Sequence, residues 1–207
     1  MHDAYLEIIR FEGEDLSSFY LDALKDRLYS SAADAARRRS AQSALLHILQ
    51  QFLAVVAPML SFTAEEAWQS LPEELRGDRA SVFDLPLTAS KAPSAETTAS
   101  WEMLKSLRAW VAASEGKRDY ELQARLTLPS VWYERMHAHV DDVREALVVS
   151  ALTLEHNAQL AQNDVKRELL PADGGKCQRC WKYLPLGTDA EHPSLCAPCA
   201  QIVRSIA

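Results

Sequence analysis

All four cysteines of this 207-residue chain lie in two Cys-x2-Cys pairs near its C-terminal end, Cys177/Cys180 and Cys196/Cys199. Two such turns that face each other place four sulfurs at the corners of a tetrahedron, and this spacing is typical of a tetrathiolate zinc site. A module this short buries too little apolar area to fold alone, so we expect one structural Zn²⁺ to stabilise it. A catalytic zinc keeps an open coordination position, which four thiolates would close.

The residues around the first cysteine pair combine aromatic and basic side chains. We call residues 177–183 the knuckle; besides its cysteines it contains Gln178, Arg179, Trp181, Lys182 and Tyr183. An indole between cations on a rigid loop suits RNA, because rings stack on unpaired bases and cations contact phosphates. Alternatively, the aromatic residues pack the module onto its neighbour. These interpretations are evenly balanced for Trp181, and packing is favoured for Tyr183.

The overall charge limits how the chain could bind a polyanion. The formal net charge is -7, so binding by bulk positive charge is excluded, although a local basic patch is not. The densest basic run is Arg37-Arg38-Arg39, for which charge alone favours a solvated helix face over phosphate contact. The sequence contains no glycine-rich phosphate loop and no G-x-S-x-G nucleophile motif.

The first part of the chain is expected to form a helical bundle. Apolar residues recur at helical spacing over 16–28, where Asp15 or Ser17 could cap the helix, and over 41–56, which Pro58 ends. Thr63-x-x-Glu66 predicts a capping box for a third helix. Ser100 is expected to cap a further helix. The apolar residues between Tyr5 and Phe11 are expected to be the core-facing side of a helix whose first turns precede the chain.

The periodicity changes at residue 120. Strict alternation over 120–128 predicts a half-buried strand, followed by a helix over 131–146 and a strand over 147–154. The fold class is therefore mainly α: a helical bundle, a small α/β subdomain and a C-terminal four-cysteine zinc module. The predicted divisions are 1–85 (bundle), 86–119 (linker and helix), 120–170 (α/β subdomain) and 171–207 (zinc module).

Five segments closely resemble bacterial-type isoleucyl-tRNA synthetases. Residues 16–29, 38–45 and 57–68 resemble the anticodon-binding helical domain of the isoleucyl, valyl and leucyl enzymes. Residues 176–183, with tryptophan directly after the second cysteine, and 192–199 resemble the isoleucyl enzymes in particular. The chain departs from the family pattern over 115–124, directly before and within the predicted strand.

The resemblance implies a specific role. The chain would be the C-terminal portion of such an enzyme and would bind the anticodon arm of tRNA(Ile); the implied contacts are Arg37, Arg38, Arg39, Gln178, Arg179, Trp181 and Lys182. Isoleucine activation with ATP would belong to a separate catalytic domain, whose HIGH and KMSKS motifs do not occur here, so we expect no aminoacylation by this chain alone. That catalytic domain would be its partner.

The remaining expectations concern assembly and location. We expect a monomer without a membrane contact, because no apolar run approaches the roughly 20 residues that span a bilayer. Reduced, metal-paired cysteines indicate the cytoplasm. One alternative function is a stand-alone zinc-ribbon adaptor that docks onto protein, with which an acidic net charge is compatible. The other, a metalloenzyme, would need an open zinc position and is disfavoured.

Overall fold

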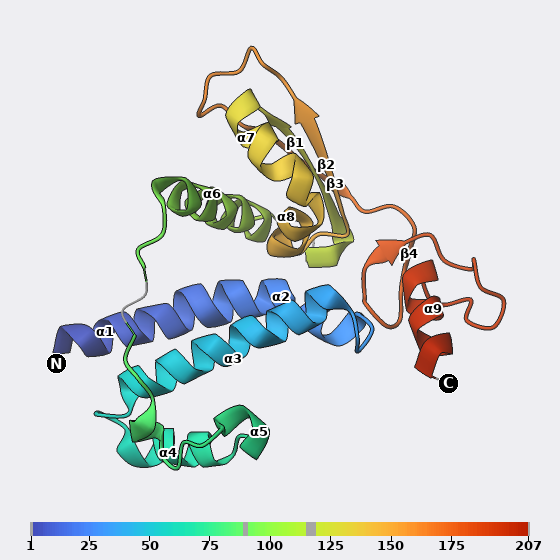
Figure 1. The fold of residues 1–207 in the computed structure, drawn as a ribbon. Helices are drawn as coiled ribbons and strands as arrows, with labels where there is room; N and C mark the ends of the chain where they lie inside the picture. Colours follow the sequence, from blue (N-terminus) through green and yellow to red (C-terminus); the bar gives the residue numbers. More distant parts are fainter. Residues whose placement is uncertain (1, 89–90, 115–118, 207) are drawn as a thin grey trace. The chain divides into compact units, whose positions relative to one another are not determined.

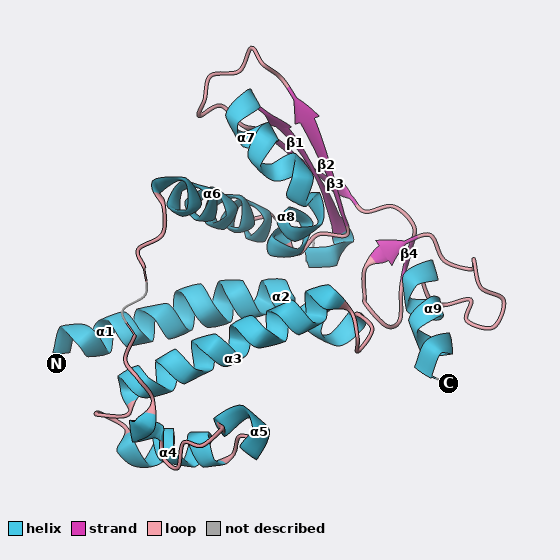
Figure 2. Cartoon of the chain, in the orientation of Figure 1, coloured by secondary structure: helices cyan, strands magenta, loops and turns pink. Residues whose placement is uncertain are grey.

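A computed structural model describes residues 2–88, 91–114 and 119–206 (Figures 1 and 2). Residues 89–90 of the expected linker, and 115–118 of the segment that departs from the family pattern, lie outside the described residues. The chain is mainly helical, with a small sheet and a cysteine cluster near the C-terminus, which confirms the predicted fold class. It forms two compact units: Ala33–Ala92, here called the helical unit, and Met1–Ala32 together with Pro93–Ala207, here called the sheet unit. The finer division into four segments stays a prediction.

The helical unit contains α3 (Ala36–Val56), α4 (Ser61–Gln69) and α5 (Glu73–Arg76), followed by a short 3-10 turn over Val82–Asp84. The predicted end of the long helix at Pro58 is confirmed, since proline cannot continue the hydrogen-bond ladder. The predicted capping box is wrong, because α4 begins earlier, with Leu60 as its N-cap and no side-chain cap. The Leu60 carbonyl accepts a hydrogen bond from Ala64 N–H at 2.8 Å, which leaves Thr63 inside the helix.

The core of the helical unit is centred on one aromatic side chain. Trp68 is fully buried, and Ala64 one turn before it is 1% exposed. Other residues of the unit share this burial: Ala41, Leu53, Ala54, Val56, Ala57 and Val82. The 3-10 turn is fastened to α4 by Glu65, whose Oε2 accepts hydrogen bonds from Ser81 Oγ at 2.8 Å and from Val82 N–H at 2.9 Å.

The sheet unit begins with helical structure that runs from α1 (His2–Arg10) through a π-helical segment (Phe11–Leu21) into α2 (Asp22–Ser30). A helix start at Asp15 or Ser17 was therefore wrong, because the backbone is already helical before them. The expected core-facing side of α1 is not buried either: α1 has no buried residue, and Tyr5, Leu6 and Ile9 are each at least half exposed.

The next helix of the sheet unit is α6 (Ala95–Ala112). Its cap is Ser94, whose hydroxyl accepts a hydrogen bond from Thr97 N–H at 3.1 Å. The prediction of Ser100 as the cap was wrong by six positions, since the helix begins before its apolar residues do. Leu107 and Val111 of this helix are buried against the sheet.

The sheet has three strands in the order β2-β1-β3. Strand β1 (Leu122–Leu128) alternates in burial as predicted; α7 (Ser130–Met136), a 3-10 turn (His137–His139) and α8 (Val140–Leu147) then lead to β2 (Ala151–His156), parallel to β1. β3 (Lys166–Pro171) pairs antiparallel with β1 and was not predicted. The second strand starts four residues later than expected, because Leu147 ends α8 and Val148 adopts a left-handed conformation with φ 56°.

The C-terminal module consists of β4 (Gly175–Lys176), β5 (Tyr183–Leu184) and α9 (Ala197–Ile206). Strands β4 and β5 pair antiparallel and enclose residues 177–182 of the knuckle between them. Gly174 has φ 94°, and a Cβ there would lie 2.5 Å from the Leu184 carbonyl, so this turn requires glycine. Among the described helices, none is both long enough and apolar enough for a membrane crossing.

Candidate metal centre and aromatic pocket

The four cysteines converge from two places in the module. Cys177 and Cys180 belong to the knuckle, whereas Cys196 and Cys199 flank the start of α9. All four are buried, and their sulfur atoms lie within 4.8 Å of one another. The Cys180 and Cys196 sulfurs are 3.8 Å apart, which matches the edge of about 3.8 Å that a tetrahedron with roughly 2.3 Å Zn–S bonds would have. The cysteines could therefore hold one metal ion.

The protonation of these thiols opposes metal binding at low pH. Burial raises the pKa of Cys196 to about 11 and raises that of Cys180 further. Burial also acts to raise the pKa of Cys177, but backbone N–H groups, including those of Cys180 and Cys196, outweigh it and lower this pKa to about 6. A metal binds the thiolates, so binding displaces protons and weakens as the pH falls.

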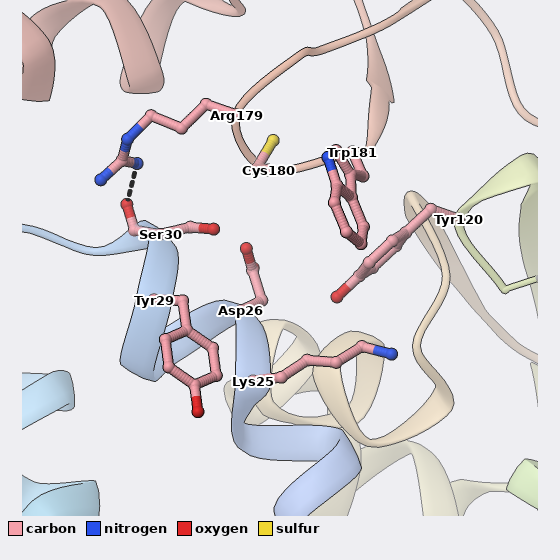
Figure 3. Close-up of a pocket in the computed structure, with 8 residues that line it drawn as sticks. All are labelled: Lys25, Asp26, Tyr29, Ser30, Tyr120, Arg179, Cys180 and Trp181. Carbon is pink, nitrogen blue, oxygen red and sulfur yellow. Dashed lines mark hydrogen bonds between the residues drawn. The ribbon is translucent and has the colours of Figure 1, made fainter.

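Two of the cations predicted to contact RNA fasten the knuckle to α2. Arg179 donates from Nη1 to the Ser30 carbonyl (Figure 3) and lies 3.7 Å from the Cys199 sulfur. Lys182 Nζ lies 2.7 Å from Asp26 Oδ2, and both side chains are largely buried. Contact of either residue with RNA stays a prediction, but each already has a partner within the protein.

Two further contacts hold the module in place. Tyr183 N–H donates to Ser150 Oγ at 2.8 Å, and Ser150 Oγ in turn donates to the Tyr120 carbonyl. The Tyr183 side chain is half-buried, consistent with the predicted packing role. Helix α2 is itself tied to α8, because Arg27 Nε donates to Glu145 Oε2 at 2.9 Å. The knuckle is therefore anchored to α2 and to the residues just before β1 and β2.

Trp181 is an exposed residue of the knuckle. Its side chain is 63% exposed, and its backbone is left-handed with φ 64°. Lys176 Nζ lies 5.9 Å from the centre of its ring. Gln178 is also exposed, and its backbone N–H donates to the Ser194 carbonyl at 3.3 Å.

The three predicted arginines belong to the helical unit. Arg37, Arg38 and Arg39 lie in the first turn and a half of α3; Arg37 and Arg39 are exposed and Arg38 is half-buried. The structure brings the predicted knuckle residues together, whereas the arginines lie in a different unit.

A pocket of about 370 Å³ opens beside the knuckle, and we call it the aromatic pocket (Figure 3). The last two turns of α2 contribute Lys25, Asp26, Tyr29 and Ser30, the knuckle contributes Arg179, Cys180 and Trp181, and Tyr120 completes it. Figure 3 shows the Trp181 indole extending from the knuckle toward the Tyr120 ring. Lys25 Nζ lies 5.8 Å from the centre of that ring.

Most of this pocket was not predicted from the sequence. Tyr29 lies at the end of a segment that resembles the family, but nothing in the sequence distinguishes Lys25 or Tyr120 as pocket residues. They are 95 residues apart in the chain, and only the folded sheet unit brings them together with the knuckle. Lys176 lies in a segment that resembles the family, but no role was predicted for it.

Comparison with known proteins agrees with the resemblance. The family model described as the anticodon-binding domain of tRNA ligase matches residues 1–126. An isoleucine–tRNA ligase from Desulfovibrio desulfuricans is 39% identical over 225 residues, covering 99% of this chain and 24% of the relative. Those of Nitratidesulfovibrio vulgaris and Bordetella pertussis are 41% and 38% identical, covering 91% and 96% of this chain and 22% of each relative. The chain thus spans about a quarter of the length of these relatives.

Proposed function

This chain belongs to the anticodon-binding domain family of tRNA ligases, and from that premise we propose that it is the tRNA-binding region of an isoleucine–tRNA ligase. The observation that carries the proposal is the identity of about 40% to isoleucine–tRNA ligases, which extends beyond the family domain to the cysteine module. The part of the tRNA that this chain binds would be the anticodon arm. Aminoacylation with ATP would belong to other domains of the enzyme, with this chain acting as a monomeric, cytoplasmic recognition region.

The geometry of the knuckle supports RNA binding. Proteins recognise single-stranded loops by stacking unpaired bases on aromatic rings and by placing cations near phosphates. Trp181 offers an exposed ring beside Lys176. Arg37 and Arg39 would add phosphate contacts from α3, where both are exposed. Gln178 would present its amide from the same loop as Trp181.

The cysteine cluster supports a structural Zn²⁺. Four buried thiols with near-tetrahedral spacing fit a soft divalent ion, and their number would leave no open position for catalysis. When bound, the metal would lock the knuckle backbone. Arg179 and Lys182 would then hold that rigid loop against α2, so that Trp181 is presented in one orientation.

A salt titration separates RNA binding from the alternative of a protein-docking adaptor, which the relatives do not favour. Affinity for the anticodon stem-loop of an isoleucine tRNA should fall steeply with salt, because phosphate contacts release counterions. Arg39→Ala should reduce the slope of log K against log salt by about 0.7–0.9, the value for one phosphate contact.

The matched control is Arg79→Ala, which removes an exposed arginine from the same unit. It should leave the slope unchanged. An affinity that hardly responds to salt, or equal slopes for the wild type and Arg39→Ala, would argue against phosphate contact by α3.

A further inference from the structure

Arg179 joins the cysteine cluster to the end of α2. Its Nη1 atom donates to the Ser30 carbonyl (Figure 3) and lies 3.7 Å from the Cys199 sulfur. This nitrogen bears two N–H groups, so it can donate to both acceptors at once. The side chain is half-buried, and solvent ions screen a partly buried charge much less than an exposed one. One guanidinium therefore contacts both a sulfur of the cluster and a helix end.

The other three sulfurs accept hydrogen bonds from the backbone of the module itself. Cys177 Sγ accepts from Cys196 N–H at 3.4 Å. The backbone N–H groups of Lys182 and Cys199 donate to Cys180 and Cys196 respectively. For the Cys199 sulfur the described donor is instead a side chain, and that side chain also reaches α2. The surroundings of this one sulfur thus depend on how the module sits against α2.

The end of α2 holds the guanidinium in place. Helix α2 ends at Ser30, and the last carbonyls of a helix have no partner within it. A cation at this position is also favoured by the helix dipole. Helix α2 is itself fixed by the ion pair of Arg27 with Glu145, whose side chain is 8% exposed. The arginine that meets Cys199 is therefore oriented from outside the module.

The metal-bound cluster would carry a charge that the free thiols lack. Four thiolates around one divalent cation leave two negative charges uncompensated, and a buried charge is costly unless it is paired and hydrogen-bonded. A guanidinium also binds a thiolate more strongly than a neutral thiol, because both groups are then charged. Lys182 already pairs with Asp26 at 2.7 Å. Arg179 pairs with no carboxylate in the described part of the chain, so its charge can serve the cluster.

We infer that Arg179 is a positioning residue of the metal site. By donating to Cys199 Sγ it stabilises the metal-bound form, and it makes the metal affinity depend on the contact with α2. Because couplings between binding events are reciprocal, a loaded cluster also holds Arg179, and with it the end of α2, more tightly. This inference goes beyond the proposed function and requires no RNA, so its failure would leave the proposed function untouched.

The metal affinity of three variants of the full chain tests the inference. Arg179→Met keeps the length of the side chain but removes its donors, so the dissociation constant for Zn²⁺, measured by competition with a chelator, should rise about 10- to 100-fold. Arg179→Lys keeps the charge but not the fork of donors, so it should lose less. The matched control is Lys182→Met, which removes a cation of the same knuckle whose side chain contacts Asp26 rather than a sulfur. It should weaken Zn²⁺ binding less than Arg179→Met does.

Cobalt spectroscopy separates a hydrogen bond to sulfur from a general loss of docking. Co²⁺ can replace Zn²⁺ among four thiolates, and its sulfur-to-metal charge-transfer absorption responds to hydrogen bonds on the sulfur. In Arg179→Met this absorption should move to longer wavelength, because a sulfur without the donor gives up electron density more readily. In Lys182→Met it should stay at the wild-type position. An unmoved band in Arg179→Met, or the same displacement in both variants, would overturn the inference.

Thiol alkylation identifies the sulfur concerned. Brief treatment of each metal-loaded chain with N-ethylmaleimide, followed by peptide mass spectrometry, gives the order in which the four cysteines react. Relative to the other three, Cys199 should react faster in Arg179→Met than in the wild type, since its thiolate has lost a hydrogen bond. If Arg179→Met binds no metal, the same order is measured in Arg179→Lys. Uniform acceleration of all four cysteines, or a Zn²⁺ affinity equal to that of the wild type, would contradict the role of Arg179.

Discussion

Replacement of Lys182 by Met tests whether the ion pair with Asp26 holds the knuckle on α2. The two side chains are 16% and 8% exposed, and their charged atoms are 2.7 Å apart. Removing one partner of a buried pair typically costs 3–5 kcal/mol, because the other charge is left uncompensated. Arg144 remains 4.0 Å from Asp26 and offsets part of that cost. We therefore expect Lys182→Met to destabilise the docked knuckle by about 3 kcal/mol.

Hydrogen exchange at the knuckle amides measures this loss directly. Trp181 N–H donates to the Cys177 carbonyl, and Cys177 N–H donates to the Lys182 carbonyl, each at 2.9 Å. If these amides exchange by local opening, a loss of about 3 kcal/mol makes exchange roughly 100-fold faster. The double variant Asp26→Asn/Lys182→Met leaves no unpaired charge, so it should regain most of the protection.

The matched control is Arg125→Met on the sheet surface. Arg125 pairs with Glu168 at 3.0 Å, but both side chains are about half exposed, so the pair should contribute less than about 1 kcal/mol. If Lys182→Met accelerates exchange at the knuckle no more than Arg125→Met does, the pair with Asp26 does not hold the knuckle and this reasoning is refuted.

Three further predictions concern the metal and the helical unit. Cys199→Ser should abolish stoichiometric zinc binding and unfold the module while the helical unit persists; metal analysis with circular dichroism checks this, and unchanged zinc content would contradict the four-cysteine site. Hydrogen bonds from Gln69 and from residues 81–82 lower the pKa of Glu65. The stabilisation that ionised Glu65 gives to the fold is therefore complete above its ordinary pKa of 4.5. It is lost as the pH falls through the lowered pKa that Glu65 has in the folded chain. Glu65→Gln should remove this part of the acid dependence of unfolding, and an unaltered pH profile would count against it. Trp68→Ala should cost about 3–5 kcal/mol and lower the melting transition of the helical unit alone; a single shifted transition for the whole chain would show that the two units unfold together.

The sequence predicted the elements whose signals are local and periodic. Strand β1 alternates because one face lies on a core, and α3 ends where Pro58 removes a backbone donor. The cysteine cluster could be predicted equally well, since the sequence spacing of cysteines in a metal site follows from the geometry of the bound metal.

The wrong helix starts have a common physical cause. Ser100 and Thr63 have the chemistry of a cap, but a cap is used only where the backbone enters the helix. The helices instead begin after Ser94, whose own hydroxyl caps α6, and after Leu60, which has no side-chain cap. Strand β3 escaped prediction because it is a largely exposed edge strand, so its sequence lacks the alternation that burial imposes.

The aromatic pocket was beyond sequence reasoning for a different reason. Its residues come from α2, from Tyr120 and from the knuckle. They form a pocket only when these separate segments come together in the fold. Lys182 illustrates the point. From the sequence it is a cation beside an indole, predicted to contact tRNA, and in the structure it is the partner of a buried carboxylate.

We propose that this chain recognises the anticodon arm of an isoleucine tRNA through the knuckle. The most direct measurement is the ratio of its affinities for that stem-loop and for an unrelated stem-loop, at one salt concentration and with metal bound. We expect a clear preference for the isoleucine stem-loop that Trp181→Ala greatly reduces. Equal, weak affinity for both stem-loops would contradict it.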